Sequence, residues 1–336
     1  MDTSRREFLA GLGTFGLGCG FACGSGFGAV NTNMTGRIPP RQQYVVEPWN
    51  EGRLRISSHT VDVGATKPFR AVHFSDTHVN FSDIEEMYAS EGNYRAGTGR
   101  YARFPQAVPS FYATLDFAAR EPGTLLLHTG DLIDFGTRAC YDFVRHNLKG
   151  LDLIYAVGNH EFERPDSSYN PDPEAQMAAL AATGVFGDLS CSSRVVNGVN
   201  FVAFDNARFG RGNVLPRVRE SVRRELDRGL PVVLMCHIPP YVSKEFHVAH
   251  MQGEIDLALQ RNAQRDVGAI LARKRTASWN GDEETVAFWK EIREHANFKA
   301  LLCGHRHWPW SEPFGRGVCH LAGGNFQGCV NELRFV

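Results

Sequence analysis

Side chains that bind metal ions occur along this sequence in five short clusters. They are Asp76-Thr77-His78, Gly130-Asp131-Leu132-Ile133-Asp134, Gly158-Asn159-His160-Glu161, His237 and Gly304-His305-Arg306-His307. Carboxylate and amide oxygens mixed with imidazole nitrogens, with no cysteine among them, favour divalent ions such as Mn, Fe or Zn. A carboxylate shared by two such ions would hold them about 3.5–4 Å apart and let them activate a bound water near neutral pH. The clusters therefore indicate two-metal chemistry.

Each cluster alone is weak evidence for a site. An Asp-x-His in a loop is more often a turn with a solvated histidine, and His237 alone could be a core histidine at the end of a strand. His73 and His128 show this ordinary case: they lie inside apolar runs with no acidic residue or glycine attached. We therefore expect both to be structural. The weight of the five clusters comes from their order, because each follows a separate apolar run.

These apolar runs predict buried strands. They are continuous rather than alternating, which is typical of strands covered on both faces, and they span residues 69–74, 124–129, 153–157, 232–236 and 300–304. Helical patterns lie between them at about 110–121, 137–149, 173–183, 215–229 and 283–297. Asn197-Gly198 within 194–205 predicts a β-hairpin, and the C-terminal stretch adds two more strand candidates.

The alternation of strands and helices predicts an α/β fold with mixed sheets covered by helices. Ligands of open α/β folds bind beyond the carboxyl ends of the strands. All five clusters follow strands, so we expect them to meet at one place. Residues 68–336 contain no linker and are expected to form one catalytic domain, preceded by a lead-in segment at 37–67 with a strand.

The ordered clusters resemble the calcineurin-like metallophosphoesterase superfamily. Its pattern is D-x-H, G-D-x-x-D, G-N-H-D/E, a lone H and G-H-x-H, and this sequence has DTH, GDLID, GNHE, CH and GHRH between about residues 69 and 336. The resemblance implies a metallophosphoesterase-type β-sandwich of mixed sheets flanked by helices. It also implies a metal-dependent hydrolase that cleaves a phosphomonoester or phosphodiester through a hydroxide bridging two metal ions. The motifs are specific for the superfamily and say little about the substrate.

The resemblance also implies a role for each motif residue. One metal ion would be held by Asp76, His78, Asp131 and His307. Asp131 would bridge to a second ion completed by Asn159, His237 and His305. His160 would be a catalytic residue rather than a ligand, facing the substrate and protonating the leaving-group oxygen. The identity of the two ions stays open among Mn, Fe and Zn.

The sequence allows two possible roles for several residues near the motifs. Asp134 and Glu161 are candidates for orienting His160 or a ligand, although Glu161 could equally be a solvated loop residue. Arg306 could contact a phosphate oxygen or form a salt bridge on the rim, and Trp308 and Trp310 could stack a leaving group or cover the core. Asp134 stands where purple acid phosphatases have a tyrosine, which disfavours an iron–tyrosinate site.

The substrate is expected to be a small phosphate ester. With 36 Lys+Arg against 37 Asp+Glu the net charge is −1, which argues against an extended nucleic-acid surface. The loops at 79–107 and 238–282 are expected to decide between monoester and diester, and the basic run at 271–278 reads as a solvated helix face. Protein substrates are discounted because Phe135 and Phe162 follow the motifs where protein phosphatases carry arginine. The alternative to an enzyme is a non-catalytic binding scaffold on the same fold, which the intact ligand set disfavours.

The N-terminal residues 1–36 predict an export signal. Arg5-Arg6 precede Phe8-Leu9 and a glycine-rich apolar run, with no charged residue between Glu7 and Arg37. This resembles a twin-arginine (Tat) signal, which implies the Tat machinery as a partner and an exported location, periplasmic or on the outer face of the cytoplasmic membrane. The alternative is a retained membrane anchor, since the run is long enough to span.

Six cysteines follow this segment, and they form no C-x-x-C pair. Cys236 and Cys303 lie inside apolar runs and are expected to be buried thiols. Cys319 with Cys329 is the most plausible disulfide, since an oxidising compartment would permit one.

Overall fold

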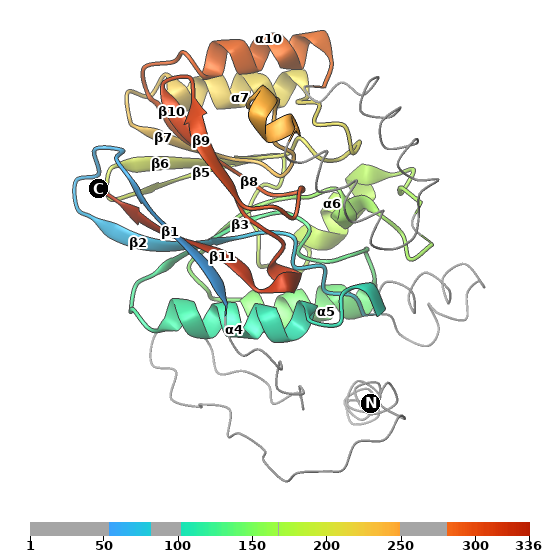
Figure 1. Cartoon of the computed structure of the whole chain (residues 1–336). Coiled ribbons are helices and arrows are strands. Elements are labelled where there is room, and N and C mark those ends of the chain that lie inside the picture. The colour runs from blue at the N-terminus through green and yellow to red at the C-terminus, as the bar shows by residue number, and fades with distance from the viewer. Residues whose placement is uncertain (1–53, 82–101, 167, 249–280) are drawn as a thin grey trace.

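Two β-sheets lie face to face between two layers of helices (Figure 1). This arrangement comes from a computed structural model that describes residues 54–81, 102–166, 168–248 and 281–336. The first sheet has the order β1-β11-β2-β3-β4. Its strands are β1 (Arg55–Val61), β11 (Cys329–Phe335), β2 (Phe69–Phe74), β3 (Leu125–Thr129) and β4 (Leu153–Ala156).

The second sheet has the order β5-β6-β7-β8-β10-β9. Its strands are β5 (Cys191–Val196), β6 (Val199–Phe204), β7 (Val232–Met235), β8 (Phe298–Cys303), β10 (Gly317–Leu321) and β9 (Trp310–Phe314). Both sheets mix parallel and antiparallel pairs: β2, β3 and β4 are parallel, as are β6, β7, β8 and β10, whereas β11 runs antiparallel to β2. The prediction of an α/β sandwich of mixed sheets flanked by helices is confirmed.

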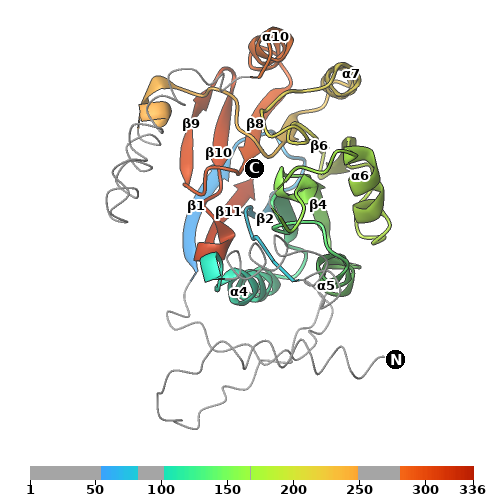
Figure 2. The ribbon, with the colours of Figure 1, turned by 90° about the vertical axis from the view of Figure 1, so that its right-hand side faces the viewer.

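Helices cover the outer face of each sheet, as Figure 2 shows from the side. The first sheet carries α4 (Ala107–Ala119) and α5 (Arg138–Leu148), and the second carries α7 (Pro216–Leu226) and α10 (Glu283–Ile292), whereas α6 (Pro173–Ala181) lies at the side of the sandwich. Two short 3₁₀ helices, η1 (His160–Phe162) and η2 (Asn325–Gln327), lie in loops that follow strands.

The strands are continuously apolar because both of their faces are buried. In β3, Leu125 and Leu127 pack between the two sheets, whereas Leu126 packs under α4 and α5. Each strand therefore buries side chains in two apolar layers at once, and at about 25 cal/mol per Å² of apolar surface this burial is the main stabilising contribution. This explains why the sequence shows runs rather than alternation.

The predicted hairpin is the β5–β6 turn. Asn197 (φ 47°) and Gly198 (φ 81°) both adopt left-handed backbone conformations, and Val196 pairs with Val199 across the turn. Two consecutive positive φ angles match the type I′ turn that the Asn-Gly pair predicts.

Trp310–Phe314 form β9 at the edge of the second sheet. One expectation about the C-terminal third is wrong. The predicted Cys319–Cys329 disulfide is absent, and both thiols are free. Cys319 lies on β10 and packs toward α7 and α10, whereas Cys329 begins β11 in the other sheet. Cys236 and Cys303 are confirmed as buried thiols, with their sulfurs 3.6 Å apart.

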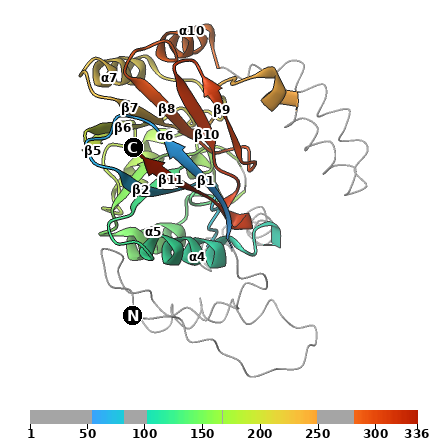
Figure 3. The ribbon, with the colours of Figure 1, turned by 60° about the vertical axis from the view of Figure 1, so that its left-hand side comes forward.

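Strand β11 comes late in the chain but lies inside the first sheet. It pairs in parallel with β1 over seven residue pairs and antiparallel with β2, so it separates these two strands (Figure 3). The segment at 37–67 therefore does contain a strand, β1, and that strand reaches the sheet only through β11.

The export-signal prediction for residues 1–36 falls outside the described residues and stays a prediction, as do the roles of the loop segments 82–101 and 249–280. Among the described helices, none is long and apolar enough to cross a membrane.

Candidate metal centre

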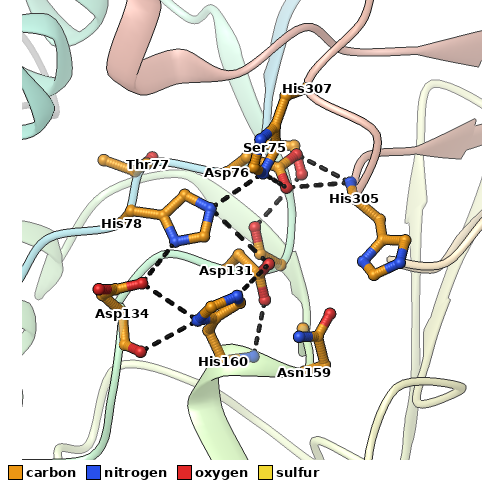
Figure 4. Close-up of polar contacts among 12 residues, drawn as sticks. Ser75, Asp76, Thr77, His78, Asp131, Asp134, Asn159, His160, His305 and His307 are labelled. Carbon is orange, nitrogen blue, oxygen red and sulfur yellow. Dashed lines mark hydrogen bonds and ion pairs between the residues drawn. The ribbon is translucent and has the colours of Figure 1, made fainter. Parts of the chain in front are cut away.

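The carboxyl ends of five strands meet at one edge of the sandwich. Asp76 follows β2, Asp131 follows β3 and Asn159 follows β4 in the first sheet; His237 follows β7 and His305 follows β8 in the second. Parallel pairing places the ends of β2, β3 and β4 side by side, and those of β7 and β8 likewise. The two sets of strand ends face each other, so the predicted residues converge (Figure 4).

The convergent side chains form three groups of possible ligand atoms: one is His78, Asp134 and His160, and the other two share Asp131. Of these two, the first contains Asp76, His78, Asp131 and His307 and the second contains Asp131, His237 and His305, with the atoms of each group lying within 4.8 Å of one another. Asn159 joins the second group, because its Oδ1 lies 3.1 Å from His237 Nε2. The structure thus brings together all seven residues that the family resemblance implies as ligands, and Asp131 lies in both groups.

The Asp131 carboxylate lies between the groups. Its Oδ2 is 3.0 Å from His237 Nε2 and 3.9 Å from His78 Nε2, and its Oδ1 accepts the backbone N–H of His160 at 2.9 Å. The side chain is almost completely buried. Burial alone would raise the pKa of Asp131, but His237 and His160 hold that pKa well below its usual range. The residue is therefore a carboxylate available to both groups.

The backbone at the ligands is strained. Among described residues other than glycine, positive φ angles occur at Asn197 of the hairpin and at five predicted ligands, namely Asp76, His78, Asp131, His305 and His307. Left-handed conformations of such residues cost about 1–3 kcal/mol each and persist only where the surroundings enforce them. Here they turn the side chains sharply off the strand ends toward one point.

Two glycines permit the close approach of these loops. A Cβ at Gly158 would overlap the backbone nitrogen and the carboxylate of Asp131, and one at Gly304 would overlap the Ser75 hydroxyl and the Asp76 carboxylate. Any side chain at either position would displace a predicted ligand.

Glu161 secures the loop that carries Asp131. It is 2% exposed, and its carboxylate accepts backbone N–H groups from Gly158 (2.7 Å), Asp131 (3.0 Å), Leu132 (2.7 Å) and Ile133 (3.1 Å). The reading of Glu161 as a solvated loop residue is therefore wrong. Burial, together with the nearby Asp131 charge, raises the pKa of Glu161 to about 7, while the four donors favour its ionised form.

Replacing Glu161 with glutamine is expected to destabilise this loop. The new amide would present N–H groups to backbone N–H groups, and each buried donor left without an acceptor costs about 1–3 kcal/mol. We expect the free energy of unfolding in urea to fall by at least about 2 kcal/mol. Glu220→Gln, on the exposed face of α7, is the matched control and should match the wild type. Equal stability of the Glu161 variant and this control would contradict the role.

Asp134 contacts two histidines of the site. Its Oδ1 lies 2.9 Å from His78 Nδ1 and 3.1 Å from His160 Nδ1, and its backbone carbonyl lies 3.1 Å from the same His160 nitrogen. Both rings are thereby turned with Nε2 toward Asp131. The expectation that Asp134 orients His160 or a ligand agrees with this geometry.

His160 is held as a cation. Burial lowers its pKa, but the charge of Asp131, the hydrogen bond to Asp134 and the charge of Glu163 outweigh burial and raise it to about 10. His78 differs, because burial is the dominant effect there and lowers its pKa to about 4. One histidine beside Asp134 is therefore charged and the other neutral, which suits a proton donor and a metal ligand respectively.

The ligand atoms fit divalent cations. His78 donates through Nδ1 to Asp134, so its Nε2 carries a lone pair, which lies 3.1 Å from His307 Nε2. His237 likewise donates through Nδ1 to the Thr129 carbonyl at 2.6 Å, which leaves Nε2 among the oxygens of Asp131 and Asn159. A cation between these atoms would satisfy the lone pairs of both groups at once.

His237 favours its protonated form when no metal ion is bound. Burial lowers the pKa of His237, but Asp131 raises it to about 9. A divalent cation would displace this proton, as is usual when histidine becomes a ligand.

Three residues that lie near the ligands were not predicted from the sequence. Glu163 Oε2 lies 3.4 Å from His160 Nδ1. Phe104 stacks on the His78 ring with centroids 4.4 Å apart, and Phe326 meets the His307 ring edge-on at 5.0 Å. One sequence feature could have predicted Glu163, namely its position three residues after His160 across a tight turn. The two phenylalanines lie far from the motifs in the sequence, and no sequence feature links them to the site.

The structure also shows the surroundings of the residues for which the sequence allowed two interpretations. Trp310 packs against Phe246 with centroids 5.5 Å apart and belongs to the core under α7 and α10, whereas Trp308 is 44% exposed. Arg306 is half-buried, and after burial its charge is the largest influence lowering the pKa of His305, which places a cation beside the centre. His73 and His128 are buried and lie 2.9 and 3.1 Å from the hydroxyls of Thr129 and Thr77.

The fold and the site together define an α/β sandwich protein with two candidate metal-binding groups that share one carboxylate. The chain belongs to the calcineurin-like phosphoesterase family, whose sequence profile matches residues 69–309. No match was found among curated proteins.

Solved structures with a similar fold include a dimetal phosphatase from Danio rerio, with 14% identity over 77% of this chain and 88% of that one and a TM-score of 0.40. A purple acid phosphatase from yellow lupin (Lupinus luteus) seeds has 13% identity over 77% and 44% of the two chains, with a TM-score of 0.42. A putative 5'-nucleotidase from Staphylococcus aureus has 11% identity over 77% and 49%, with a TM-score of 0.38. At these values the likeness concerns the fold alone.

Proposed function

We propose that this protein is a metal-dependent hydrolase of a small phosphate ester. The observation that carries the proposal is the pair of buried ligand groups sharing the Asp131 carboxylate. Membership of the calcineurin-like phosphoesterase family supports the same chemistry. A non-catalytic scaffold would have no need to keep all seven ligands and a charged His160 at one point, so the enzyme is the better reading.

The chain contributes positioning and one proton to this reaction. Two bound cations would supply an activated water near neutral pH and would neutralise charge on the phosphoryl oxygens. His160 keeps Nδ1 against Asp134, so the proton on Nε2 is the one offered to the leaving-group oxygen. Asp131 accepts the His160 backbone N–H, which fixes the donor relative to the ligands. Arg306 stands between the predicted ligands His305 and His307, and the proposal gives it contact with a phosphate oxygen.

Metal removal tests the proposal directly. Treatment with a chelator is expected to abolish hydrolysis of an aryl phosphate, and added Mn, Zn or Fe should restore it. Rates on matched aryl mono- and diesters then assign the ester class, since a hundredfold preference corresponds to about 2.7 kcal/mol of transition-state discrimination. Full activity in a metal-free preparation would refute the proposal. Absence of hydrolysis with every metal and both ester types would favour the scaffold.

A further inference from the structure

Thr77 stands between two predicted metal ligands, Asp76 and His78, at the position for which the family pattern D-x-H specifies no residue. In Figure 4 the side chains of Asp76 and His78 extend toward the other ligands, and the Thr77 side chain lies apart from them. Both ligands have left-handed backbone conformations, with φ angles of 55° and 54°. Such conformations persist only where the surroundings enforce them. The contacts that Thr77 makes are therefore candidates for holding this loop.

The Thr77 hydroxyl belongs to a chain of buried hydrogen bonds that begins at the other ligand loop. The backbone N–H of Gly130, next to Asp131, donates to His128 Nδ1 at 3.1 Å. Because Nδ1 is an acceptor, the ring is neutral and its proton is on Nε2. This Nε2 lies 3.1 Å from Thr77 Oγ1 and donates to it. One imidazole thus joins the loop of Asp131 to the loop of Asp76.

Asn325 of η2 continues the chain. The Thr77 hydroxyl donates to Asn325 Oδ1 at 3.1 Å, and Asn325 Nδ2 donates to Thr114 Oγ1 of α4 at 2.8 Å. The Thr114 hydroxyl donates in turn to the Ser110 carbonyl at 2.9 Å, so the chain ends inside a helix. The side chains of Thr77, His128, Asn325 and Thr114 are at most 1% exposed, so bulk water does not compete for these bonds.

We propose that Thr77, His128 and Asn325 are positioning residues of the candidate metal centre. The Thr77 hydroxyl is fixed both as an acceptor and as a donor, which fixes the peptide units on either side of it. The directions in which Asp76 and His78 leave the backbone are fixed with them. The proposal rests on the proposed function only through the metal centre, and hydrolysis is not part of it.

Backbone hydrogen bonds also join the two ligand loops. Asp76 N donates to the Gly130 carbonyl and His78 N donates to the Asp131 carbonyl, each at 2.9 Å. These bonds connect the loops to each other, whereas the side-chain bonds connect both loops to α4 and η2. An experiment therefore has to remove the Thr77 hydroxyl and leave the backbone bonds in place.

Equilibrium competition with a chelator measures the Mn²⁺ affinity of the full-length protein without reference to hydrolysis. Thr77→Val keeps the branched shape of the side chain and leaves His128 Nε2 and Asn325 Oδ1 without their partner. We expect it to weaken Mn²⁺ binding by about tenfold or more, the lower end of the range for residues that orient metal ligands. Thr77→Ser restores the hydroxyl and should bind Mn²⁺ like the wild type.

Thr285→Val is the matched control. Thr285 of α10 is also fully buried, and its hydroxyl accepts the Val214 N–H at 3.0 Å. This variant should lose stability and keep wild-type Mn²⁺ affinity, which separates positioning of ligands from a general cost of losing a buried hydroxyl. If Thr77→Val fails to fold, His128→Phe decides by the same measurement, since it keeps an aromatic ring against Phe74 and removes both ring nitrogens.

Wild-type Mn²⁺ affinity in Thr77→Val, or equal weakening in Thr77→Val and Thr285→Val, would overturn the proposal. Failure of Thr77→Ser to restore binding would also count against it, because the hydroxyl is the group that the proposal requires. A wild type that binds none of Mn, Zn and Fe would refute both this proposal and the proposed function. Metal binding that depends on the Thr77 hydroxyl, without hydrolysis of any ester, would refute the proposed function alone.

Discussion

Replacing Asp131 with asparagine is expected to lower kcat/KM for a phosphate ester by more than about a thousandfold, beyond the usual loss of one electrostatic stabiliser. The substitution keeps the shape of the side chain and removes the charge that both ligand groups share. It also removes the carboxylate that does most to keep His160 protonated. Metal analysis of the purified variant should find less than the two ions per chain expected for the wild type.

The control for this variant is Asp227→Asn, an exposed carboxylate whose partner is His295. It should retain wild-type metal content and activity, which separates loss of the shared charge from a general effect of the substitution. Two tightly held ions and undiminished turnover in the Asp131 variant would exclude Asp131 as the bridging ligand.

Replacing His160 with alanine is expected to lower kcat by about a hundredfold to ten-thousandfold, the usual range for loss of a general acid. Metal content should stay at the wild-type level, since no ligand is removed. The loss should depend on the leaving group, because an aryl alcohol departs readily without a proton and an alkyl alcohol does not. Parallel rates on aryl and alkyl phosphates measure this difference.

His146→Ala, on the exposed surface of α5, is the control and should leave both rates unchanged. An equal loss on aryl and alkyl substrates in the His160 variant would argue that His160 positions the phosphate and does not donate a proton. Loss of metal from that variant would instead make it a ligand.

The strands and ligand clusters could be predicted because their signals are local in the sequence. Burial on both faces makes β3 an uninterrupted apolar run, and the residues after it have to turn sharply, so Gly130 and Asp131 stand together. The division of ligands into two groups was available only through the family resemblance. It depends on how the ends of two sheets face each other, and spacing within one chain does not specify that.

What could not be predicted depends on contacts between distant segments. Phe104 and Phe326 surround His78 although more than two hundred residues separate them in the chain, and neither belongs to a motif. The Cys319–Cys329 pairing failed for the same reason, since ten residues of separation say nothing about which sheet each strand joins. The four-donor role of Glu161 was likewise invisible, because backbone N–H groups have no sequence signature.

The position of β11 has a consequence for the order in which the protein can assemble during synthesis. Until residue 335 has left the ribosome, β1 and β2 have no strand between them, and both present unpaired backbone edges to other chains. All seven predicted ligands are translated before that point, so the nascent chain carries the metal-binding side chains before the sheet that orients Asp76 and Asp131 is complete. Productive metal loading is therefore expected to follow translation, and the unpaired strand edges are prone to aggregation in the interval.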